Sequence, residues 1–209
     1  WLFLHSGSRG IGNKIAQYHI DIARKLCKQY FIELDDPDLS YLPEGTKEFG
    51  DYISDLNWAQ EFALLNREEM MDRVIKDFSY FMTGKNGEIR ELERINTHHN
   101  FTKKERHFGK DVWLSRKGAI DAHEGTLGLI PGSMGTDSFV VRGKGNKMSF
   151  NSSPHGAGRN FSRSHARKTF NLDQLKESMK GIEYKESAEF IDEIPQAYKD
   201  INIVMNDSK

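Results

Sequence analysis

The sequence predicts an α+β protein with a helical first half and a mainly β second half. Apolar residues recur every three or four positions in residues 11–26 and again in residues 58–81, a spacing typical of amphipathic helices. From residue 112 onward, short apolar runs alternate with Gly, Pro and Asp, which indicates strands joined by turns. The length of 209 residues suits one domain with a single sizeable core, so we expect one domain over residues 1–209.

The start of the chain combines an apolar run, a glycine-rich turn and a helix. Residues 1–5 (WLFLH) begin without Met, and their apolar character indicates the middle of a buried strand. Residues 6–12 (SGSRGIG) predict a tight turn before the first helix. Residues 35–50 hold two prolines and many acidic side chains, which predicts an ordered loop or a short-helix connector.

A second helix is predicted after this connector. Asp55 or Asn57 can cap its start, and a GKNG segment at residues 84–87 ends it. Its apolar side chains form one stripe that we expect to be buried in the core. The stripe consists of Trp58, Phe62, Leu65, Met71, Val74, Phe78 and Phe81.

The second half is predicted to hold five short strands and two helices. The strands begin at residues 112 (VWLS), 118 (GAI), 127 (LGLI), 138 (SFVVR) and 148 (MSF). The helical stretches cover residues 162–170 and 193–205, and a proline near the start of the second suits a first helical turn.

Composition limits the partners and the compartment. The chain has 30 basic and 31 acidic residues, so no overall field attracts nucleic acid or membrane, and a polyanion site has to be a local cluster. The single cysteine, Cys27, excludes an intramolecular disulfide, and its helical position predicts a buried thiol in a reducing cytoplasm. No apolar run approaches the roughly 20 residues of a membrane span, so we expect a soluble cytoplasmic protein without a membrane partner.

Three histidines lie in contexts that suit chemistry. His5 ends the predicted first strand, His99 lies in THHNF, and His155 leads HGAGR. A histidine at a strand end beside a turn is a common metal ligand, although each of these taken alone is also compatible with a structural role. His5 and His99 do not complete a metal site by themselves, because catalytic metal sites usually have three or more protein ligands.

Basic residues beside glycine-rich turns predict a phosphate-binding surface. They are Arg9, Arg116, Lys117, Arg159 and Arg163. We expect the last two to lie one helical turn apart on one face. Residues 131–136 (PGSMGT) form a further small-residue loop whose N–H groups can bind an anion or a base edge. Each feature has an ordinary explanation as a turn or a solvated charge, but their combination favours phosphate.

Six segments match, in order, the motifs of one known family. They are HSGSRGIGN (residues 5–13), HHN (98–100), RKGA (116–119), IPGSMGTDSFVVRGKGN (130–146), HGAGRNFSR (155–163) and DEIPQAYKDINIVM (192–205). Together they resemble the RtcB family of RNA ligases over nearly the whole chain. The resemblance implies a catalytic domain with a β-sheet core flanked by helices.

The resemblance implies an RNA ligase that depends on GTP and manganese. Such a ligase joins an RNA 2′,3′-cyclic phosphate or 3′-phosphate end to a 5′-hydroxyl end, in tRNA splicing or RNA repair. His155 matches the family's nucleophile, which attacks the α-phosphate of GTP and forms a histidine–GMP intermediate. A neutral imidazole suits this step, because its pKa of about 6.5 leaves a nitrogen lone pair at neutral pH.

The resemblance also implies roles for other residues. The positions that match ligands to one of two manganese ions are His5 and His99. The positions expected to bind RNA phosphates are Arg9, Lys117, Arg159 and Arg163. The positions expected to hold GMP are Asn100, Pro131, Gly132, Ser133, Met134, Ser138, His155, Gly156, Ala157, Gly158 and, packed near the guanine, Tyr198.

The chain departs from the family pattern near both ends. The family's upstream Asp, Cys and His metal ligands have no counterpart here, and the chain stops at Lys209 without the family's Lys-Gly ending. We therefore expect a fragment that is truncated at both ends and does not ligate RNA alone. Two alternatives stay open: a paralogue that acts on another end such as a DNA 3′-phosphate, and a noncatalytic RNA-binding relative. The physiological RNA and any activating protein partner also stay open.

Overall fold

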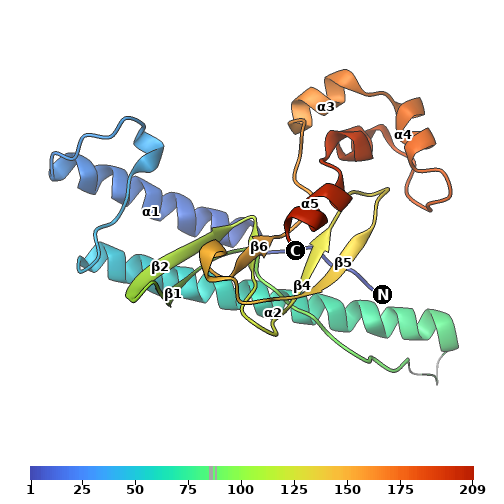
Figure 1. Cartoon of the computed structure of the whole chain (residues 1–209), viewed down its shortest axis with the longest axis horizontal. Helices are drawn as coiled ribbons and strands as arrows, with labels where there is room; N and C mark the ends of the chain where they lie inside the picture. Colours follow the sequence, from blue (N-terminus) through green and yellow to red (C-terminus); the bar gives the residue numbers. More distant parts are fainter. Residues whose placement is uncertain (85–86, 88) are drawn as a thin grey trace. The chain divides into compact units, whose positions relative to one another are not determined.

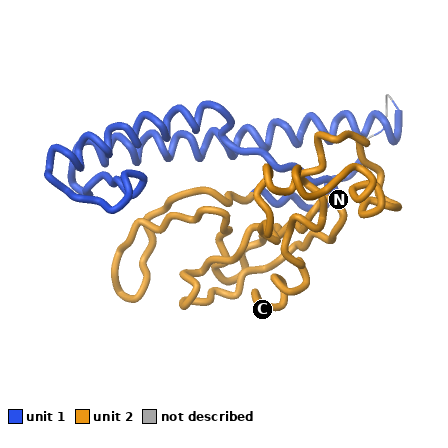
Figure 2. Tube along the Cα trace, turned by 90° about the horizontal axis from the view of Figure 1, so that it is seen from above, with its two compact units in different colours: residues 1–96 blue, residues 97–209 orange. Residues whose placement is uncertain are grey.

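The structure of the protein is a computed structural model that describes residues 1–84, 87 and 89–209. It contains helices and antiparallel strands, which confirms the predicted α+β class (Figure 1). The chain divides into two compact units, Trp1–Asn96 and Thr97–Lys209, which Figure 2 distinguishes by colour. None of the described helices is both long enough and apolar enough to cross a membrane.

In its described residues the first unit contains two α-helices, α1 (Arg9–Gln29) and α2 (Lys47–Thr83). The predicted first helix is confirmed, and the 3-10 helix η1 (Pro37–Leu39) lies in the connector where a short helix was expected. His19 of α1 places Nε2 2.8 Å from Oδ2 of Asp55 on α2. A polar pair therefore joins the two helices.

The start of α2 differs from the prediction, whereas its end agrees. The helix begins at Lys47, not at Asp55 or Asn57, and the hydroxyl of Thr46 accepts a hydrogen bond from the N–H three residues later at 3.2 Å. An extended threonine before the first helical residue satisfies one of the unpaired N–H groups of a helix start, so the helix begins at this earlier cap. Gly84, with φ of +78°, ends α2 as predicted, and the next two residues of the GKNG segment lie outside the described residues.

The predicted opening strand is wrong. Residues 1–7 have no helix or strand, and Trp1 is 91% exposed. A strand satisfies its N–H and C=O groups by pairing with another strand, and the described residues of the first unit include no such partner.

The apolar stripe of α2 is not the buried core that its spacing predicts. Most of its members are exposed, namely Trp58, Leu65, Val74, Phe78 and Phe81. The buried residues of α2 are Ala59 and Ala63, whose small side chains allow a neighbouring element to approach closely. On α1, Cys27 is buried as predicted.

Six strands of the second unit form three antiparallel pairs. These are β1 (Asn100–His107) with β2 (Lys110–Lys117), β3 (Ala119–Asp121) with β6 (Ser152–Pro154), and β4 (Leu127–Pro131) with β5 (Ser138–Arg142). Within the described residues these pairs are three separate two-stranded sheets. The four strands predicted to begin between residues 112 and 138 are confirmed as β2 to β5.

Strands β1 and β6 were not predicted, and one predicted strand is wrong. The sequence of β1, NFTKKERH, is mostly polar, so its strand character comes from pairing with β2 and not from an apolar run. The MSF run at 148–150 overlaps the 3-10 helix η2 (Lys147–Ser149), and its last residue, Phe150, has φ of +53°. A positive φ is incompatible with an extended strand.

Short helices complete the second unit. The helix predicted at 162–170 is confirmed as α3 (Arg163–Thr169), whereas α4 (Leu172–Ser178) was not predicted. The single helix predicted over 193–205 is divided into the 3-10 helix η4 (Pro195–Ala197) and α5 (Ile201–Asp207). The division occurs because Tyr198 between them is extended and forms an isolated β-bridge with Arg159.

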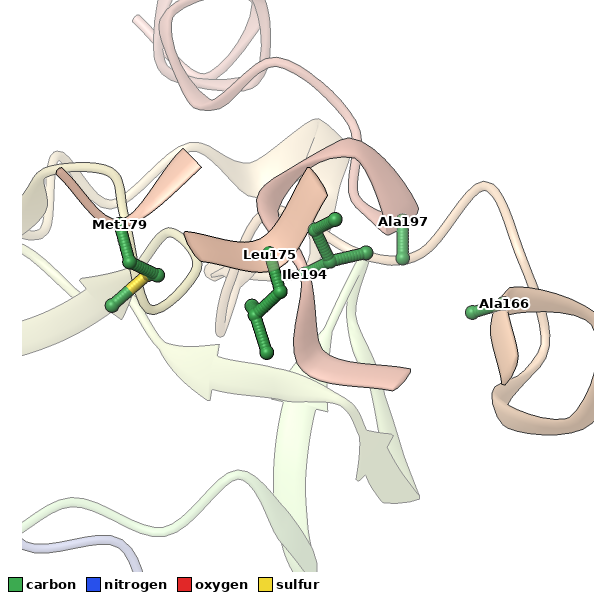
Figure 3. Close-up of a cluster of buried hydrophobic side chains, with 5 residues drawn as sticks. All are labelled: Ala166, Leu175, Met179, Ile194 and Ala197. Carbon is green, nitrogen blue, oxygen red and sulfur yellow. The ribbon is translucent and has the colours of Figure 1, made fainter. Parts of the chain in front are cut away.

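Two buried hydrophobic clusters stabilise the second unit. Figure 3 shows the first cluster, which consists of Ala166, Leu175, Met179, Ile194 and Ala197. The second cluster consists of Ile120, Ile130, Ala157 and Ile201. Tyr198 packs against both clusters and so connects the short helices to strands β3 and β4.

Candidate functional site

His155 follows strand β6 and is held by Gly118, the residue between β2 and β3. The Gly118 carbonyl oxygen accepts a hydrogen bond from the His155 N–H at 3.3 Å and lies 2.8 Å from Nδ1 of the ring. Because a carbonyl oxygen only accepts, Nδ1 carries the proton, and the lone pair of the neutral ring is on Nε2. Gly118 has φ of +66°, and a Cβ there would lie 3.4 Å from two atoms of the imidazole.

The ring of His99 stacks on the ring of His155. The two centroids are 4.7 Å apart, and the planes differ by 4°. His99 lies directly before β1, and its carbonyl accepts a hydrogen bond from the Ala119 N–H at 3.2 Å. The second unit therefore brings two of the three candidate histidines together. His5 lies in the first unit, in the exposed irregular segment before α1.

The segment that follows the candidate nucleophile is packed tightly. The buried Ala157 donates from its N–H to the Pro131 carbonyl at 3.1 Å, and a Cβ on Gly156 would lie 3.1 Å from the same oxygen. Gly158, with φ of +74°, accepts at its carbonyl from the Lys199 N–H at 3.0 Å. Glycine is favoured at 156 because backbone lies against it, and at 158 because φ is positive.

The loop after β4 is ordered by its own hydrogen bonds. The Ser133 N–H donates to the Thr136 hydroxyl at 2.6 Å, and the Gly132 N–H donates to the carbonyl five residues later at 3.0 Å. Met134 packs against the first hydrophobic cluster, and Ser138 is exposed at the start of β5. Two N–H groups that the sequence suggested for anion binding therefore donate within the loop.

Arg159 and Arg163 converge on an acidic pair, Asp192 and Glu193. The prediction that the two arginines lie one helical turn apart is wrong, because α3 begins at Arg163 and Arg159 precedes it. Arg159 Nη1 lies 3.3 Å from Glu193 Oε2 and 2.9 Å from the Tyr198 hydroxyl, while Nη2 donates to the Asp192 carbonyl. Arg163 Nη1 lies 2.8 Å from Asp192 Oδ2 and also contacts Glu193.

The environment of this acidic pair shifts two pKa values. Burial disfavours the ionised form of Asp192, but the hydrogen bond from Arg163 and the charge of Arg167 outweigh it and lower the pKa of Asp192. Burial and the hydrogen bond to Glu193 raise the pKa of Tyr198 to about 12, so Tyr198 stays protonated and donates. Sequence reasoning missed Asp192 and Glu193, although they begin the DEIPQAYK segment that it singled out.

Arg116 is buried, so the suggestion that it faces a phosphate is wrong. Its two terminal guanidinium nitrogens bind Glu105, with Nη1 2.6 Å from Oε1 and Nη2 3.0 Å from Oε2. The third nitrogen, Nε, donates to the Ser152 hydroxyl at 2.9 Å. Burial disfavours ionised Glu105, but the hydrogen bonds from Arg116 and His107 outweigh it and lower the pKa of Glu105 to about 2. The guanidinium therefore compensates a buried carboxylate.

The remaining candidates lie at the ends of elements. Lys117 is exposed at the end of β2, opposite Asn100 in the β1–β2 register. Asn100 directs Oδ1 to the Gly118 N–H at 3.0 Å. Arg9 is exposed at the first position of α1 in the first unit.

A group of possible metal ligands that was not predicted lies near β1 and β3. Glu105, Asp121 and His123 each place one ligand atom within 4.8 Å of the others. The sequence offers no ligand-spacing motif for them, because Glu105 lies in one strand pair and Asp121 in another, and only the folded chain brings them together. All three groups are already engaged, since Arg116 binds Glu105, and Nδ1 of His123 lies 2.5 Å from Oδ1 of Asp121.

Residues 1–209 match the protein family described as tRNA-splicing ligase RtcB. The chain belongs to the RtcB family. This confirms the resemblance drawn from the six motifs.

Curated relatives of the RtcB family extend well beyond the chain. The RNA-splicing ligase RtcB1 of Escherichia coli strain ATCC 25922 is 48% identical over 207 residues, and the RNA-splicing ligase RtcB of strain K12 is 47% identical over 207 residues. Each comparison covers 98% of this chain and 51% of the relative. The tRNA-splicing ligase RtcB of Nanoarchaeum equitans is 35% identical over 228 residues, which cover 98% of this chain and 47% of the relative. The chain thus spans about half the length of these relatives.

Proposed function

We propose that this chain carries the nucleotidyl-transfer centre of a GTP- and manganese-dependent RNA ligase. The ligase joins an RNA end with a 2′,3′-cyclic phosphate or 3′-phosphate to a 5′-hydroxyl end, in tRNA splicing or RNA repair. The main support is the His155 ring, because its hydrogen bond to Gly118 keeps a lone pair on Nε2. The names of the RtcB relatives, which are RNA-splicing ligases, support the reaction class.

His155 acts as the nucleophile in this proposal. Nε2 attacks the α-phosphorus of GTP, a nitrogen–phosphorus bond forms, and pyrophosphate leaves with the electrons of the broken phosphorus–oxygen bond. An oxygen of the RNA 3′-phosphate then attacks the same phosphorus and returns the electron pair to Nε2. Finally the RNA 5′-hydroxyl attacks the activated 3′-phosphate and GMP leaves. A cyclic phosphate is first opened by hydrolysis.

GMP would be held by the backbone segments around this ring. The glycines on either side of Ala157 allow the backbone to approach a phosphate closely. The candidate contacts are Asn100, Ser138, Tyr198 and residues 131–134. Tyr198 offers an aromatic ring for packing near the guanine.

Manganese is assigned to His5 and His99. An imidazole binds divalent transition metals, while manganese also favours oxygen ligands, so His99 fits as part of a ligand set. In the part of the second unit that the structure describes, the carboxylate-bearing ligand group is the separate Glu105–Asp121–His123 set, whose Glu105 already binds Arg116. A bound manganese ion would neutralise charge on the triphosphate.

RNA phosphates would be bound by exposed or exchangeable cations. Lys117 and Arg9 are exposed. Arg163 binds carboxylates on the protein surface, and a phosphate that replaced Glu193 would exchange one charge-assisted hydrogen bond for another. We place this reaction in the cytoplasm, in keeping with the single unpaired cysteine.

The test is covalent labelling of the full-length protein with α-labelled GTP and manganese. We expect a label that acid removes and alkali does not, which the His155→Ala variant loses completely. The matched control is His165→Ala, which changes an exposed histidine of α3 and should keep the label. Absence of label in the folded, manganese-bound wild type would contradict the proposal and favour a noncatalytic RNA-binding protein.

A second assay separates the ligase from a related enzyme. RNA and DNA carrying labelled 3′-phosphate ends are incubated side by side with a 5′-hydroxyl acceptor. Joining of the RNA ends supports the proposed reaction. Transfer of GMP to DNA ends without joining would instead support the paralogue that modifies another 3′-phosphate.

A further inference from the structure

Glu193 binds three side chains of the candidate site. Its Oε1 atom contacts Nη1 of Arg163, its Oε2 atom lies 3.3 Å from Nη1 of Arg159, and Oε2 also accepts a hydrogen bond from the Tyr198 hydroxyl. The two arginines are candidates for binding RNA phosphates, and Tyr198 is a candidate for packing near the guanine. One carboxylate therefore contacts both the RNA-binding and the nucleotide-binding candidates.

The two acidic neighbours differ in how firmly they are held. The Asp192 side chain is 2% exposed and is bound by Arg163 at 2.8 Å and by Arg167 at 2.7 Å. The Glu193 side chain is 23% exposed, and that of its partner Arg163 is 67% exposed. A buried carboxylate is costly to separate from its guanidinium partners, whereas an ion pair open to solvent contributes little to stability. Asp192 therefore stabilises the fold, whereas Glu193 can leave Arg163 at a small cost.

The two arginines stay in place when Glu193 leaves Arg163. Both carboxylates contact the same nitrogen of Arg163, Nη1, and Asp192 remains bound to it. Arg159 is held separately, because its Nε donates to the Phe161 carbonyl at 2.9 Å and its Nη2 donates to the Asp192 carbonyl. A phosphate offers charged oxygen acceptors as a carboxylate does, so it can replace Glu193 on a guanidinium that the protein already orients.

We infer that Glu193 is an internal competitor, which occupies the position of an RNA phosphate on Arg163 and thereby lowers the affinity for RNA. The inference rests on the proposed function, in which Arg163 binds an RNA phosphate. RNA reaches this guanidinium only after Glu193 has moved away, so breaking the ion pair is part of the free energy of binding. Removing the charge of Glu193 should therefore strengthen RNA binding, although it removes contacts of the folded protein.

The first measurement compares RNA affinities. A fluorescent RNA with a 3′-phosphate is titrated with full-length protein, and anisotropy gives the dissociation constant. Glu193→Gln keeps an oxygen that accepts from the Tyr198 hydroxyl but removes the charge, so it should tighten binding on the order of fivefold. Unchanged or weaker binding would overturn the inference. If wild type binds too weakly to measure, binding gained by Glu193→Gln supports the inference, and no binding by either protein overturns it.

Two further comparisons show where the charge acts. Glu189→Gln removes an exposed carboxylate from the same 3-10 helix, η3 (Ala188–Glu193), and should change the affinity much less. In an Arg163→Gln background, Glu193→Gln should tighten binding no more than Glu189→Gln does. An equal gain from Glu189→Gln, or an undiminished gain without Arg163, would mean that the charge acts through the general field of the protein, and would overturn the inference.

Urea unfolding separates competition from a purely structural role. Asp192→Asn should lower the urea midpoint clearly, because it disturbs a buried ion pair, whereas Glu193→Gln should leave the midpoint near that of wild type. An equal fall in both variants would mean that Glu193 serves the fold, and would overturn the inference. Covalent labelling with GTP is measured on the same proteins. If wild type takes no label, the proposed nucleotidyl transfer fails, whereas the RNA affinities still decide the role of Glu193.

Discussion

Two arginines with similar sequence surroundings occupy opposite environments. Arg116 precedes a Lys-Gly pair and Arg163 ends the HGAGRNFSR segment, and both were candidates for phosphate binding. The Arg116 side chain is 1% exposed against Glu105, whereas that of Arg163 is 67% exposed against Asp192 and Glu193. The residues next to an arginine in sequence therefore do not determine whether it is buried in the fold or exposed for binding a ligand.

Strand register explains the burial of Arg116. It lies opposite Phe101 in the β1–β2 ladder, and every second residue of β1 shares that face of the hairpin. Glu105 and His107 lie on this face, and the guanidinium lies 5.1 Å from the centroid of the Phe101 ring. Arg163 instead begins the short helix α3, where it remains largely open to solvent.

Stability should show the largest difference between the two arginines. Arg116→Met should lower the free energy of unfolding by about 3–5 kcal/mol, because it leaves Glu105 buried without its main partner. Arg163→Met should cost at most about 1 kcal/mol, because exposed ion pairs contribute little and Asp192 keeps Arg167 at 2.7 Å. Urea unfolding measures both values. Adding Glu105→Leu to Arg116→Met should recover stability, and a double variant as unstable as the single one would contradict this explanation.

Lowering the pH should destabilise the folded protein, because it protonates Glu105, the partner of Arg116. The pKa of Glu105 is lowered to about 2 in the folded protein, whereas an unfolded glutamate has a pKa of about 4.3. A lowered pKa stabilises the folded state above the unfolded value, and this contribution is lost as the pH falls from about 4 to about 2. The urea midpoint of wild type should fall across this range, and that of Glu105→Gln should fall less. Parallel curves for the two proteins would show that Glu105 does not titrate with unfolding.

For RNA binding, a substitution of Arg163 should have the larger effect and a substitution of Arg116 the smaller, which is the reverse of their order for stability. Arg163→Gln should weaken binding of a 3′-phosphate RNA a few-fold and reduce the slope of log affinity against log salt by about 0.7, the value for one phosphate contact on a single strand. The folded fraction of Arg116→Met should keep the wild-type slope. Fluorescence anisotropy at several salt concentrations gives both slopes. An unchanged slope in Arg163→Gln would mean that Arg163 stays with its carboxylates in the complex.

The sequence correctly predicted those elements that nearby residues determine, through apolar spacing or a helix cap. Helix α1 follows from apolar spacing, and α3 begins beside a serine cap, so both were predictable. Strand β1 was not, because its polar residues become a strand only through pairing with β2. The start of α2 was also missed, because its Thr46 cap precedes the apolar stripe.

The candidate site depends on tertiary contacts that no local pattern encodes. The stacking of His99 on His155 joins positions far apart in the chain, and only the family resemblance placed both in one site. Gly118 has no polar side chain to mark it, yet its backbone carbonyl orients the ring of His155. The acidic pair at Asp192 and Glu193 was missed because carboxylate side chains are usually solvated.

Tyr198→Phe should give a small loss of stability in the Arg163 region. The Tyr198 hydroxyl accepts from Arg159 Nη1 at 2.9 Å and donates to Glu193. The variant keeps the ring in both hydrophobic clusters, the guanidinium 4.7 Å from the ring centroid, and the Arg159–Glu193 ion pair at 3.3 Å. The expected loss of unfolding free energy is about 1 kcal/mol, the usual value of one hydrogen bond.

Tyr184→Phe provides the matched control for Tyr198→Phe. The Tyr184 hydroxyl is buried and has no hydrogen-bond partner among the described residues, so its removal should cost less than that of the Tyr198 hydroxyl. Urea unfolding of both variants gives the difference. A loss of about 3 kcal/mol or more in Tyr198→Phe would mean that one hydroxyl holds Arg159 and Glu193 together. The arginines of this region would then serve the fold as Arg116 does.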